Sequence, residues 1–310
     1  MRHTLRAATA LIATVGIIVS FAGCATLPEQ GRPLIVVTTN ILGDVVTEIV
    51  GDVAEVVTLM QPNADPHSFE ISAQQAAALD HAALVVSSGL GLEEGLEQHV
   101  KRVERDGGNL FVAGEHVTAI PYASDTAAEA LDPHFWTDPT QMVSVVAELE
   151  KTLLNLDGFD EKARSTVAAR ASDYSARLTA LDSSIASRFA ALPSEHRVLV
   201  TNHHVFGYFA QRYNFRILGT AIPGGTTLAA PSAADLRELV NAIEDTGVAS
   251  IFAESSSPDR LMQVLASEAD LEIEVVELFT ESLTAPGGGA ESYTEMLRTN
   301  ADRIVTGLAA

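Results

Sequence analysis

The stretch that decides the fold is DEKARSTVAARASDYSARLTALDSSIASRFAAL, residues 160–192. It is rich in Ala, Leu and Arg, carries no strand signal, and follows a break in the helical pattern at residues 157–160. This pattern predicts a single helix of about 30 residues, roughly 45–50 Å long, which could brace two lobes. Two shorter helices packed in one domain would also fit, and we favour the single long helix.

Short β-branched runs alternate with helical patterns on both sides of this stretch. Strands are expected at Leu34–Thr39, Glu55–Met60, Leu84–Ser88, Asn109–Ala113, Val198–Asn202, Phe215–Gly219, Ser250–Glu254 and Glu274–Phe279. Helices are expected near residues 43–50, 72–80, 92–105, 205–213, 232–246, 258–268 and 290–308. Strands that alternate with helices favour parallel sheets covered on both faces. We therefore predict an α/β fold of two lobes, each with a mostly parallel four-stranded sheet flanked by helices, joined by one long linking helix.

The first residues have the layout of a secretory signal peptide. Arg2 and Arg6 precede an uncharged apolar run, Ala7–Phe21, which is too short to span a bilayer comfortably. Residues 25–33 have no apolar periodicity and carry two prolines, so they are typical of a tether. We expect a signal peptide over residues 1–23.

The apolar run ends in Phe21-Ala22-Gly23-Cys24. Small residues just ahead of a cysteine are what bacterial lipoprotein processing recognises before it attaches lipid to the thiol, although Leu is more usual where Phe21 stands. We predict that Cys24 carries a lipid that anchors the protein to the outer side of the cell membrane, with residues 24–33 as the lipidated tether. An ordinary signal peptide with a chance cysteine is the alternative.

Length and composition agree with two lobes. About 285 residues remain after the signal peptide, which is more than one hydrophobic core usually serves, and 47% of the residues are apolar. The predicted boundaries are an N-terminal lobe over residues 34–137, a helical linker over 138–193 and a C-terminal lobe over 194–310.

Charge and cysteine content exclude several classes of function. The formal net charge of −22 disfavours nucleic acid or anionic lipid as a partner. It suits a solubilising surface or a mild attraction for cations equally well. Because Cys24 is the only cysteine, no disulfide can form within the chain, and no thiolate is left for a metal site or redox chemistry.

Among the nine histidines, those at expected strand ends stand out. His67 lies in Asp65-Pro66-His67-Ser68-Phe69-Glu70 beyond an expected strand, and His134 lies in the similar phrase Asp132-Pro133-His134-Phe135-Trp136. His203 and His204 follow directly on another strand, where alternation lets only one side chain reach a cleft. Ligands in open α/β sheets gather outside the carboxyl ends of strands. The others are expected to be solvated or structural: His3, His81, His99, His116 and His196.

Three imidazoles at such positions indicate a metal site, because imidazole is the commonest side-chain ligand for zinc and related ions. A fourth donor would complete a tetrahedron. The candidates are Glu254 and Glu281, which lie at the carboxyl ends of the last two expected strands. Either could instead be a solvated loop carboxylate.

These segments resemble the zinc- and manganese-binding solute-binding lipoproteins of bacterial ATP-binding-cassette importers. The resemblance covers essentially the whole mature chain. Residues 65–70 look like the first ligand motif of that family, residues 132–136 resemble its second, Thr201-Asn202-His203-His204-Val205-Phe206-Gly207-Tyr208-Phe209 is similar to its third, and residues 279–283 align with its fourth.

The resemblance implies that the metal ligands are His67, His134, His203 and Glu281. His204 then stands where Asp is common. Members usually carry Asp where this chain has Glu281, so the carboxylate reaches one methylene further and its mode of coordination is open. Glu254 becomes a neighbouring residue rather than a ligand.

The same resemblance implies the function. A non-enzymatic protein, expected to be a monomer, would hold a divalent ion between its lobes and deliver it to a membrane permease and its ATPase. Three imidazoles and one carboxylate suit Zn²⁺. Mn²⁺ or Fe²⁺ stays open, because residues 121–131 lack the His-rich loop that many zinc-binding members carry there.

Two other classes of function are weighed. A secreted zinc hydrolase could use Glu254 as its general base if Glu281 were not a ligand, but no His-Glu-x-x-His helix, Gly-x-Ser-x-Gly elbow or phosphate-binding loop is present. The Gly-rich stretches at 223–225 and 286–289 have only turn chemistry. A surface adhesin or metal buffer could use the same fold without transport.

Overall fold

The computed structural model of the protein describes residues 31–122, 130–222 and 224–309. The expected signal peptide, Cys24 and most of the expected tether lie outside the described residues. Among the residues that are described, no helix combines the length and apolar character needed to cross a membrane.

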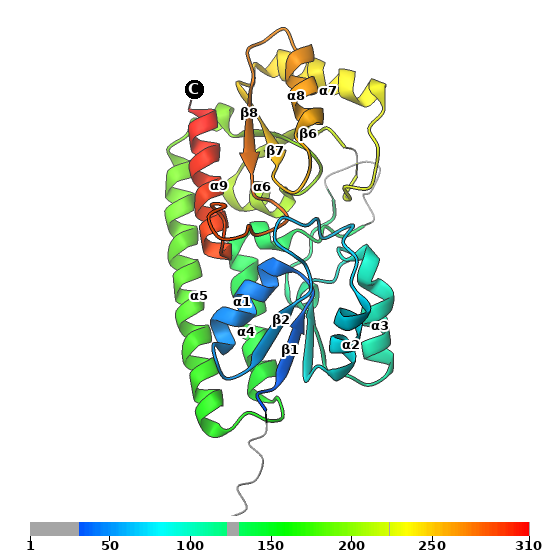
Figure 1. Ribbon diagram of the computed structural model, residues 1–310. Helices are drawn as coiled ribbons and strands as arrows, with labels where there is room; N and C mark the ends of the chain where they lie inside the picture. Colours follow the sequence, from blue (N-terminus) through cyan, green and yellow to red (C-terminus); the bar gives the residue numbers. More distant parts are fainter. Residues whose placement is uncertain (1–30, 123–129, 223, 310) are drawn as a thin grey trace, which may run out of the picture. The chain divides into compact units, whose positions relative to one another are not determined.

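The N-terminal half is built on one parallel sheet of four strands in the order β2-β1-β3-β4 (Figure 1). Its elements are β1 (Leu34–Val37), α1 (Asn40–Val50), β2 (Glu55–Thr58), α2 (Ala73–His81), β3 (Leu84–Ser87), α3 (Glu97–Arg105) and β4 (Leu110–Val112). Alternate β1 residues face opposite layers: Ile35 and Val37 join the cluster that contains α1, whereas Val36 joins the one under α2 and α3. Both faces are therefore covered, as the unbroken apolar strands predict.

The long linking helix is confirmed. Helix α4 (Pro139–Leu154) is followed by α5 (Glu161–Ala190), which has 30 residues and at the standard rise is about 45 Å long. Gly158 has a φ of +90° in the break between them, and the Asp160 carboxylate caps α5 by accepting the Ala163 N–H at 2.7 Å. The buried residues of α5 recur every three or four positions, so one stripe of the helix faces the core: Val167, Ala171, Tyr174, Leu178, Leu181, Ile185 and Phe189.

Helix α5 is fastened to both halves (Figure 1). Near its start, Arg170 donates to the Glu48 carbonyl of α1 at 2.7 Å, and Arg177 pairs with the Glu48 carboxylate at 2.5 Å. Near its end, the buried Asp182 accepts from Arg212 at 2.9 Å and from the Tyr213 hydroxyl at 3.0 Å. A rigid element therefore runs from α1 to the C-terminal half.

The C-terminal half carries the four expected strands as two parallel pairs, β5 with β6 and β7 with β8, in place of one continuous ladder. Its elements are β5 (Val198–Thr201), α6 (Gly207–Tyr213), β6 (Arg216–Thr220), α7 (Ala233–Thr246), β7 (Ser250–Glu254), α8 (Arg260–Glu268), β8 (Glu274–Leu278) and α9 (Tyr293–Leu308). β5 and β7 lie next to each other. At their carboxyl ends the Asn202 side chain, not the backbone, accepts the Glu254 N–H at 3.0 Å, so a side-chain bond joins the two pairs there. On the other side of β5, its pairing with β6 shifts register between Leu199 and Val200.

The largest hydrophobic cluster is shared by the two halves. It runs from Ile35 on β1 through Phe135 and Tyr174 to Phe252 on β7 and Ile304 on α9. Contacts of this kind make a contiguous core. Separating the halves widely would therefore expose buried apolar surface.

A partly buried acid lies where the first and last helices meet. Asp44 on α1 accepts the Tyr293 N–H at the start of α9 at 2.9 Å. Burial is the main cause that raises the pKa of Asp44 to about 6, and the negative charge of Glu48 raises it further. The hydrogen bond from the Tyr293 amide and the positive charge of Arg177 act in the opposite direction and lower it. An unfolded aspartate titrates near pH 3.9. Between about pH 4 and 6 the folded protein keeps a proton that the unfolded chain has released, so this group lowers stability as the pH rises through that window.

Replacing Asp44→Asn tests this account, since asparagine keeps an acceptor for the Tyr293 amide and removes the buried charge. We expect the free energy of unfolding of the variant to be higher than that of the wild type by on the order of 2 kcal/mol at about pH 7.5. Near pH 4 the two proteins should be equally stable. Thermal and urea unfolding at both pH values measure the difference. Glu55→Gln, at an exposed acid of β2, is the control for loss of a charge; an equal gain there would contradict the explanation.

Candidate metal centre

Four buried side chains from four separate loops converge on one point. His67 follows β2, His134 precedes α4, His203 follows β5 and Glu281 follows β8. Each is exposed by 2% or less, and one ligand atom from each lies within 4.8 Å of all the others. The structure thus brings together the four residues that the sequence predicts as ligands.

Five distances between donor atoms of the four groups suit a small tetrahedral ion. A zinc ion with bonds of about 2.0–2.1 Å would hold its tetrahedral donors about 3.3–3.4 Å apart. The Nε2 atom of His134 lies 3.3 Å from His67 Nε2 and 3.4 Å from His203 Nε2. The Glu281 Oε1 atom lies 3.2 Å from His134 Nε2 and 3.4 Å from His203 Nε2, and Oε2 lies 3.5 Å from His67 Nε2.

The Glu281 carboxylate is fully buried, yet among the described residues no hydrogen-bond partner satisfies either of its oxygens. A buried carboxylate is costly unless it is paired with a cation or hydrogen-bonded. Two further buried carboxylates, Asp132 and Glu254, stand directly behind the imidazoles. The site is therefore built to be completed by a cation.

The two Asp-Pro-His segments form the same local turn. Asp65 Oδ1 accepts the His67 N–H at 2.9 Å, and Asp132 Oδ1 accepts the His134 N–H at 2.9 Å. An aspartate that bonds the backbone two residues on makes such a turn, and the proline between them restricts φ. Each histidine is therefore presented from a fixed backbone.

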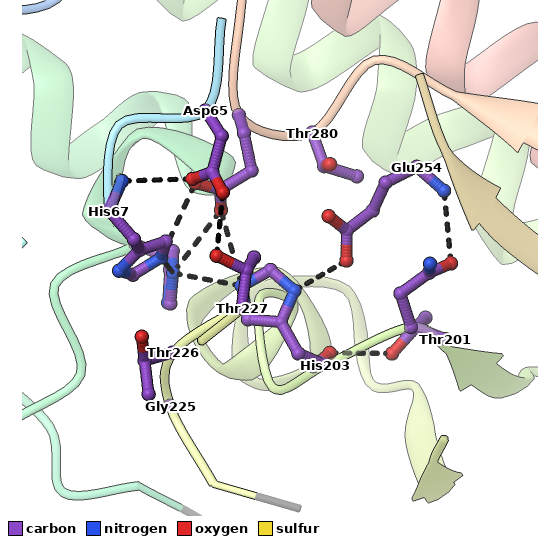
Figure 2. A network of polar contacts seen from close by, with 12 residues as sticks. Asp65, His67, Thr201, His203, Gly225, Thr226, Thr227, Glu254 and Thr280 are labelled. Carbon is purple, nitrogen blue, oxygen red and sulfur yellow. Dashed lines mark hydrogen bonds and ion pairs between the residues drawn. The ribbon is translucent and has the colours of Figure 1, made fainter. Parts of the chain in front are cut away.

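Carboxylates hold the Nδ1 atoms of two ligand rings. Asp132 Oδ1 lies 2.7 Å from His134 Nδ1, and Glu254 Oε1 bonds His203 Nδ1 (Figure 2). A carboxylate on one ring nitrogen fixes the tautomer that leaves the other nitrogen free for a metal and makes it a stronger donor. Of the two acids that the sequence left open, Glu281 lies in the cluster and Glu254 lies behind His203.

The electrostatics of the cluster favour a positive charge. Burial alone would lower the pKa of His134, but Glu281 and Asp132 outweigh it and raise the pKa to about 9. Burial would likewise lower the pKa of His203, but Glu254 and Glu281 outweigh it and raise that pKa well above its ordinary value. Burial dominates at His67 and lowers its pKa to about 4. For Glu281, burial opposes ionisation, but His134 and His67 bring its pKa well below the ordinary value.

Residues 35–307 match the family described as the periplasmic zinc-uptake complex component A, ZnuA. The chain belongs to this family. It is 30% identical over 308 residues to the zinc-binding protein TroA of Treponema pallidum, a match that spans 97% of each chain. It is 26% identical over 303 residues to the manganese ABC transporter substrate-binding lipoprotein PsaA of Streptococcus anginosus, covering 94% of this chain and 96% of that protein.

Solved structures agree with this assignment. The periplasmic zinc-binding protein TroA of Treponema pallidum superposes with a TM-score of 0.81 at 29% identity, covering 90% of this chain and all of that one. A metal-binding periplasmic protein of Candidatus Liberibacter asiaticus has the same fold, with a TM-score of 0.80 at 24% identity, covering 89% of this chain and all of that one. ZnuA-family proteins are metal-binding components of importers and not enzymes, so the hydrolase alternative is set aside.

In this member of the ZnuA family the third motif also supports the second. Gly207 lies so close to Asp132 that a Cβ atom there would stand 2.3 Å from Asp132 Oδ2. The Tyr208 hydroxyl donates to the Asp132 carbonyl at 2.9 Å. Both residues belong to the Phe-Gly-Tyr-Phe run after His203, so this run holds the aspartate that orients His134.

The fourth motif is held from two sides. Trp136 Nε1 donates to the Thr280 carbonyl at 2.8 Å, next to Glu281. Asn40 at the start of α1 donates to Ser282 Oγ at 2.7 Å and accepts the Leu283 N–H at 2.9 Å. The role of Asn40 could not be predicted from the sequence, because its partners lie more than 240 positions away.

Replacing Glu254→Gln tests the role of the carboxylate behind His203. We expect metal affinity to fall by about 10- to 100-fold, the usual cost of losing such a partner, with the fold intact. Competition with a chelating dye measures affinity, and circular dichroism checks the fold. Glu277→Gln on β8, outside the cluster, is the matched control and should bind like the wild type; a wild-type affinity for Glu254→Gln would refute the assignment.

Proposed function

We propose that the protein captures Zn²⁺ with His67, His134, His203 and Glu281 and delivers it to the permease of an ATP-binding-cassette importer. The observation that carries the proposal is the buried cluster itself, in which three imidazole nitrogens and one carboxylate lie within 4.8 Å of one another and His134 Nε2 lies 3.2–3.4 Å from each of the other three groups. The ion is the cargo in this scheme, and the protein performs no reaction on it.

Zinc is preferred over manganese on the chemistry of the donors. Imidazole nitrogens bind zinc more tightly than Mn²⁺, and manganese favours oxygen-rich octahedral sites. The relatives are named for both metals, TroA for zinc and PsaA for manganese. Both Glu281 oxygens face the imidazoles, so a two-oxygen mode is within reach for a larger ion. Mn²⁺ and Fe²⁺ are therefore the competitors to measure against.

The proposed cycle uses both halves. Residues 34–137 would act as one lobe and supply His67 and His134, while residues 194–310 would supply His203 and Glu281. Docking on the permease would withdraw ligands of one lobe from those of the other. The shared core and the helices of residues 138–193 favour a small movement over wide opening.

We propose further that a lipid on Cys24 holds the protein at the outer side of the membrane. The apolar run ahead of Cys24 supports this, and relatives such as PsaA are named lipoproteins. The residues between Cys24 and the first strand would then be the tether.

Metal binding by the chain from residue 25 onward tests the proposal. Structural zinc sites release about 10–16 kcal/mol, shared by four ligands, so loss of one ligand should cost at least about 100-fold in affinity. We expect calorimetry and dye competition to find one zinc site in the metal-free wild type. The variants His67→Ala, His203→Ala and Glu281→Ala should each bind zinc at least about 100-fold more weakly. Zinc should also raise the Tm of the wild type.

His204→Ala is the matched control, because His204 adjoins His203 but lies outside the cluster; it should bind zinc like the wild type. Tighter binding of Mn²⁺ than of Zn²⁺ would change the cargo and keep the site. A stripped wild type that binds neither ion would refute the proposed function.

A further inference from the structure

A short segment of the C-terminal half reaches across to the N-terminal half beside the metal site. The segment, residues 224–227, lies between β6 and α7, and we name it the clasp. Three hydrogen bonds fasten it: the Tyr122 hydroxyl donates to the Gly225 carbonyl at 2.7 Å, Thr226 Oγ1 donates to Glu94 at 3.0 Å, and Thr227 Oγ1 donates to Asp65 Oδ2 at 2.6 Å.

Two of these bonds end on groups that touch metal ligands. Asp65 holds the backbone of His67 through its other oxygen, Oδ1, at 2.9 Å. The Tyr122 ring stands edge-on to the His134 ring with centroids 6.2 Å apart. Figure 2 shows Gly225, Thr226 and Thr227 of the clasp, with Thr227 bonded to Asp65. The clasp therefore contacts the immediate neighbours of both ligands from the N-terminal half.

The glycines of the clasp are required by this close approach. A Cβ atom on Gly225 would stand 1.8 Å from Tyr122 Cζ, so no larger residue fits against the ring. Gly224 has a φ of +97°, a conformation that favours glycine. The turn chemistry that the sequence shows at this point thus serves a contact between the halves.

The two Asp-Pro-His turns differ in what holds them. Asp132 bonds the ring of its own histidine, His134, at 2.7 Å. Asp65 Oδ2 instead accepts from the hydroxyls of Thr227 and Ser68, the latter at 3.1 Å. The carboxylate of the first turn is thus bonded to the opposite half, whereas the carboxylate of the second turn bonds its own histidine, and that turn meets the opposite half through the Asp132 carbonyl, which accepts from the Tyr208 hydroxyl at 2.9 Å.

We propose that Thr227 is a positioning residue that sets the rate of metal release, by holding Asp65 and through it His67 against the ligands of the C-terminal half. The inference rests on the proposed function. A hydroxyl that donates to a carboxylate makes a strong bond. Lifting a four-residue segment nevertheless breaks only a few bonds, whereas parting the shared core would expose much apolar surface. Breaking the clasp is thus less costly than parting the shared core when the ion leaves.

The release rate of Zn²⁺ tests the proposal. The zinc-loaded chain is mixed with an excess of a chelating dye in a stopped-flow instrument. Thr227→Val, which keeps the shape and removes the hydroxyl, should release zinc about tenfold faster than the wild type. Thr227→Ser should restore the slow rate, which a packing role for the threonine would not. Tyr122→Phe, which removes a second bond of the clasp, should also speed release.

Thr179→Val on α5 is the matched control, because the exposed Thr179 hydroxyl donates to the Ser175 carbonyl of its own helix at 2.8 Å; its rate should stay near that of the wild type. A wild-type rate for both Thr227→Val and Tyr122→Phe overturns the proposal, as does an equal acceleration by Thr179→Val. If Thr227→Val fails to fold, Tyr122→Phe alone decides. A wild type that retains no zinc overturns the proposed function as well, whereas one that retains zinc with unchanged variant rates overturns the clasp alone.

Discussion

Four electron-rich atoms are forced together in a dry interior, and the architecture around the site depends on that constraint. Three imidazole nitrogens and a carboxylate lie within 4.8 Å of one another, and among the described residues neither oxygen of the buried Glu281 carboxylate has a satisfied hydrogen bond, so the cluster is costly without a positive charge. A cation supplies the missing attraction, but only if the ligands cannot drift apart or rotate. The surrounding hydrogen bonds meet that need. Asp132 and Glu254 fix rings, while Asn40 and Trp136 hold the chain around Glu281.

Much of the fold could be predicted from local pattern. The alternation of β-branched runs and helical periods placed the eight strands to within two residues, and the unbroken helical pattern placed α5. Pairing in the C-terminal half could not be foreseen in the same way, because it depends on contacts distant in sequence. The side chain of Asn202 meets the backbone of Glu254 only after both strands are in place.

The four predicted ligands converge because each lies in a loop that follows a strand or precedes a helix. The choice between Glu254 and Glu281 could not be made from spacing alone, since both end strands of a parallel pair, and only the resemblance to a family separated them. In space the distinction is simple: Glu281 shares the point where the Nε2 atoms meet, whereas Glu254 lies on the far side of the His203 ring. The supporting role of Gly207 was equally hidden, because a glycine in a sequence gives no sign of the carboxylate it lies against.

The shared core bears on how a membrane partner can recognise this protein. In binding proteins whose lobes move widely, the angle between the lobes differs between the loaded and the empty state. Here apolar contacts run unbroken from β1 to α9, and a single helix packs against both halves. The angle between the halves can therefore change little when the ion binds. Loaded and empty molecules would then differ chiefly in the loops that carry the four ligand residues. A permease would then distinguish the loaded from the empty protein by contacts with a small surface formed by those loops. How reliably it does so would depend on how firmly the loops are held.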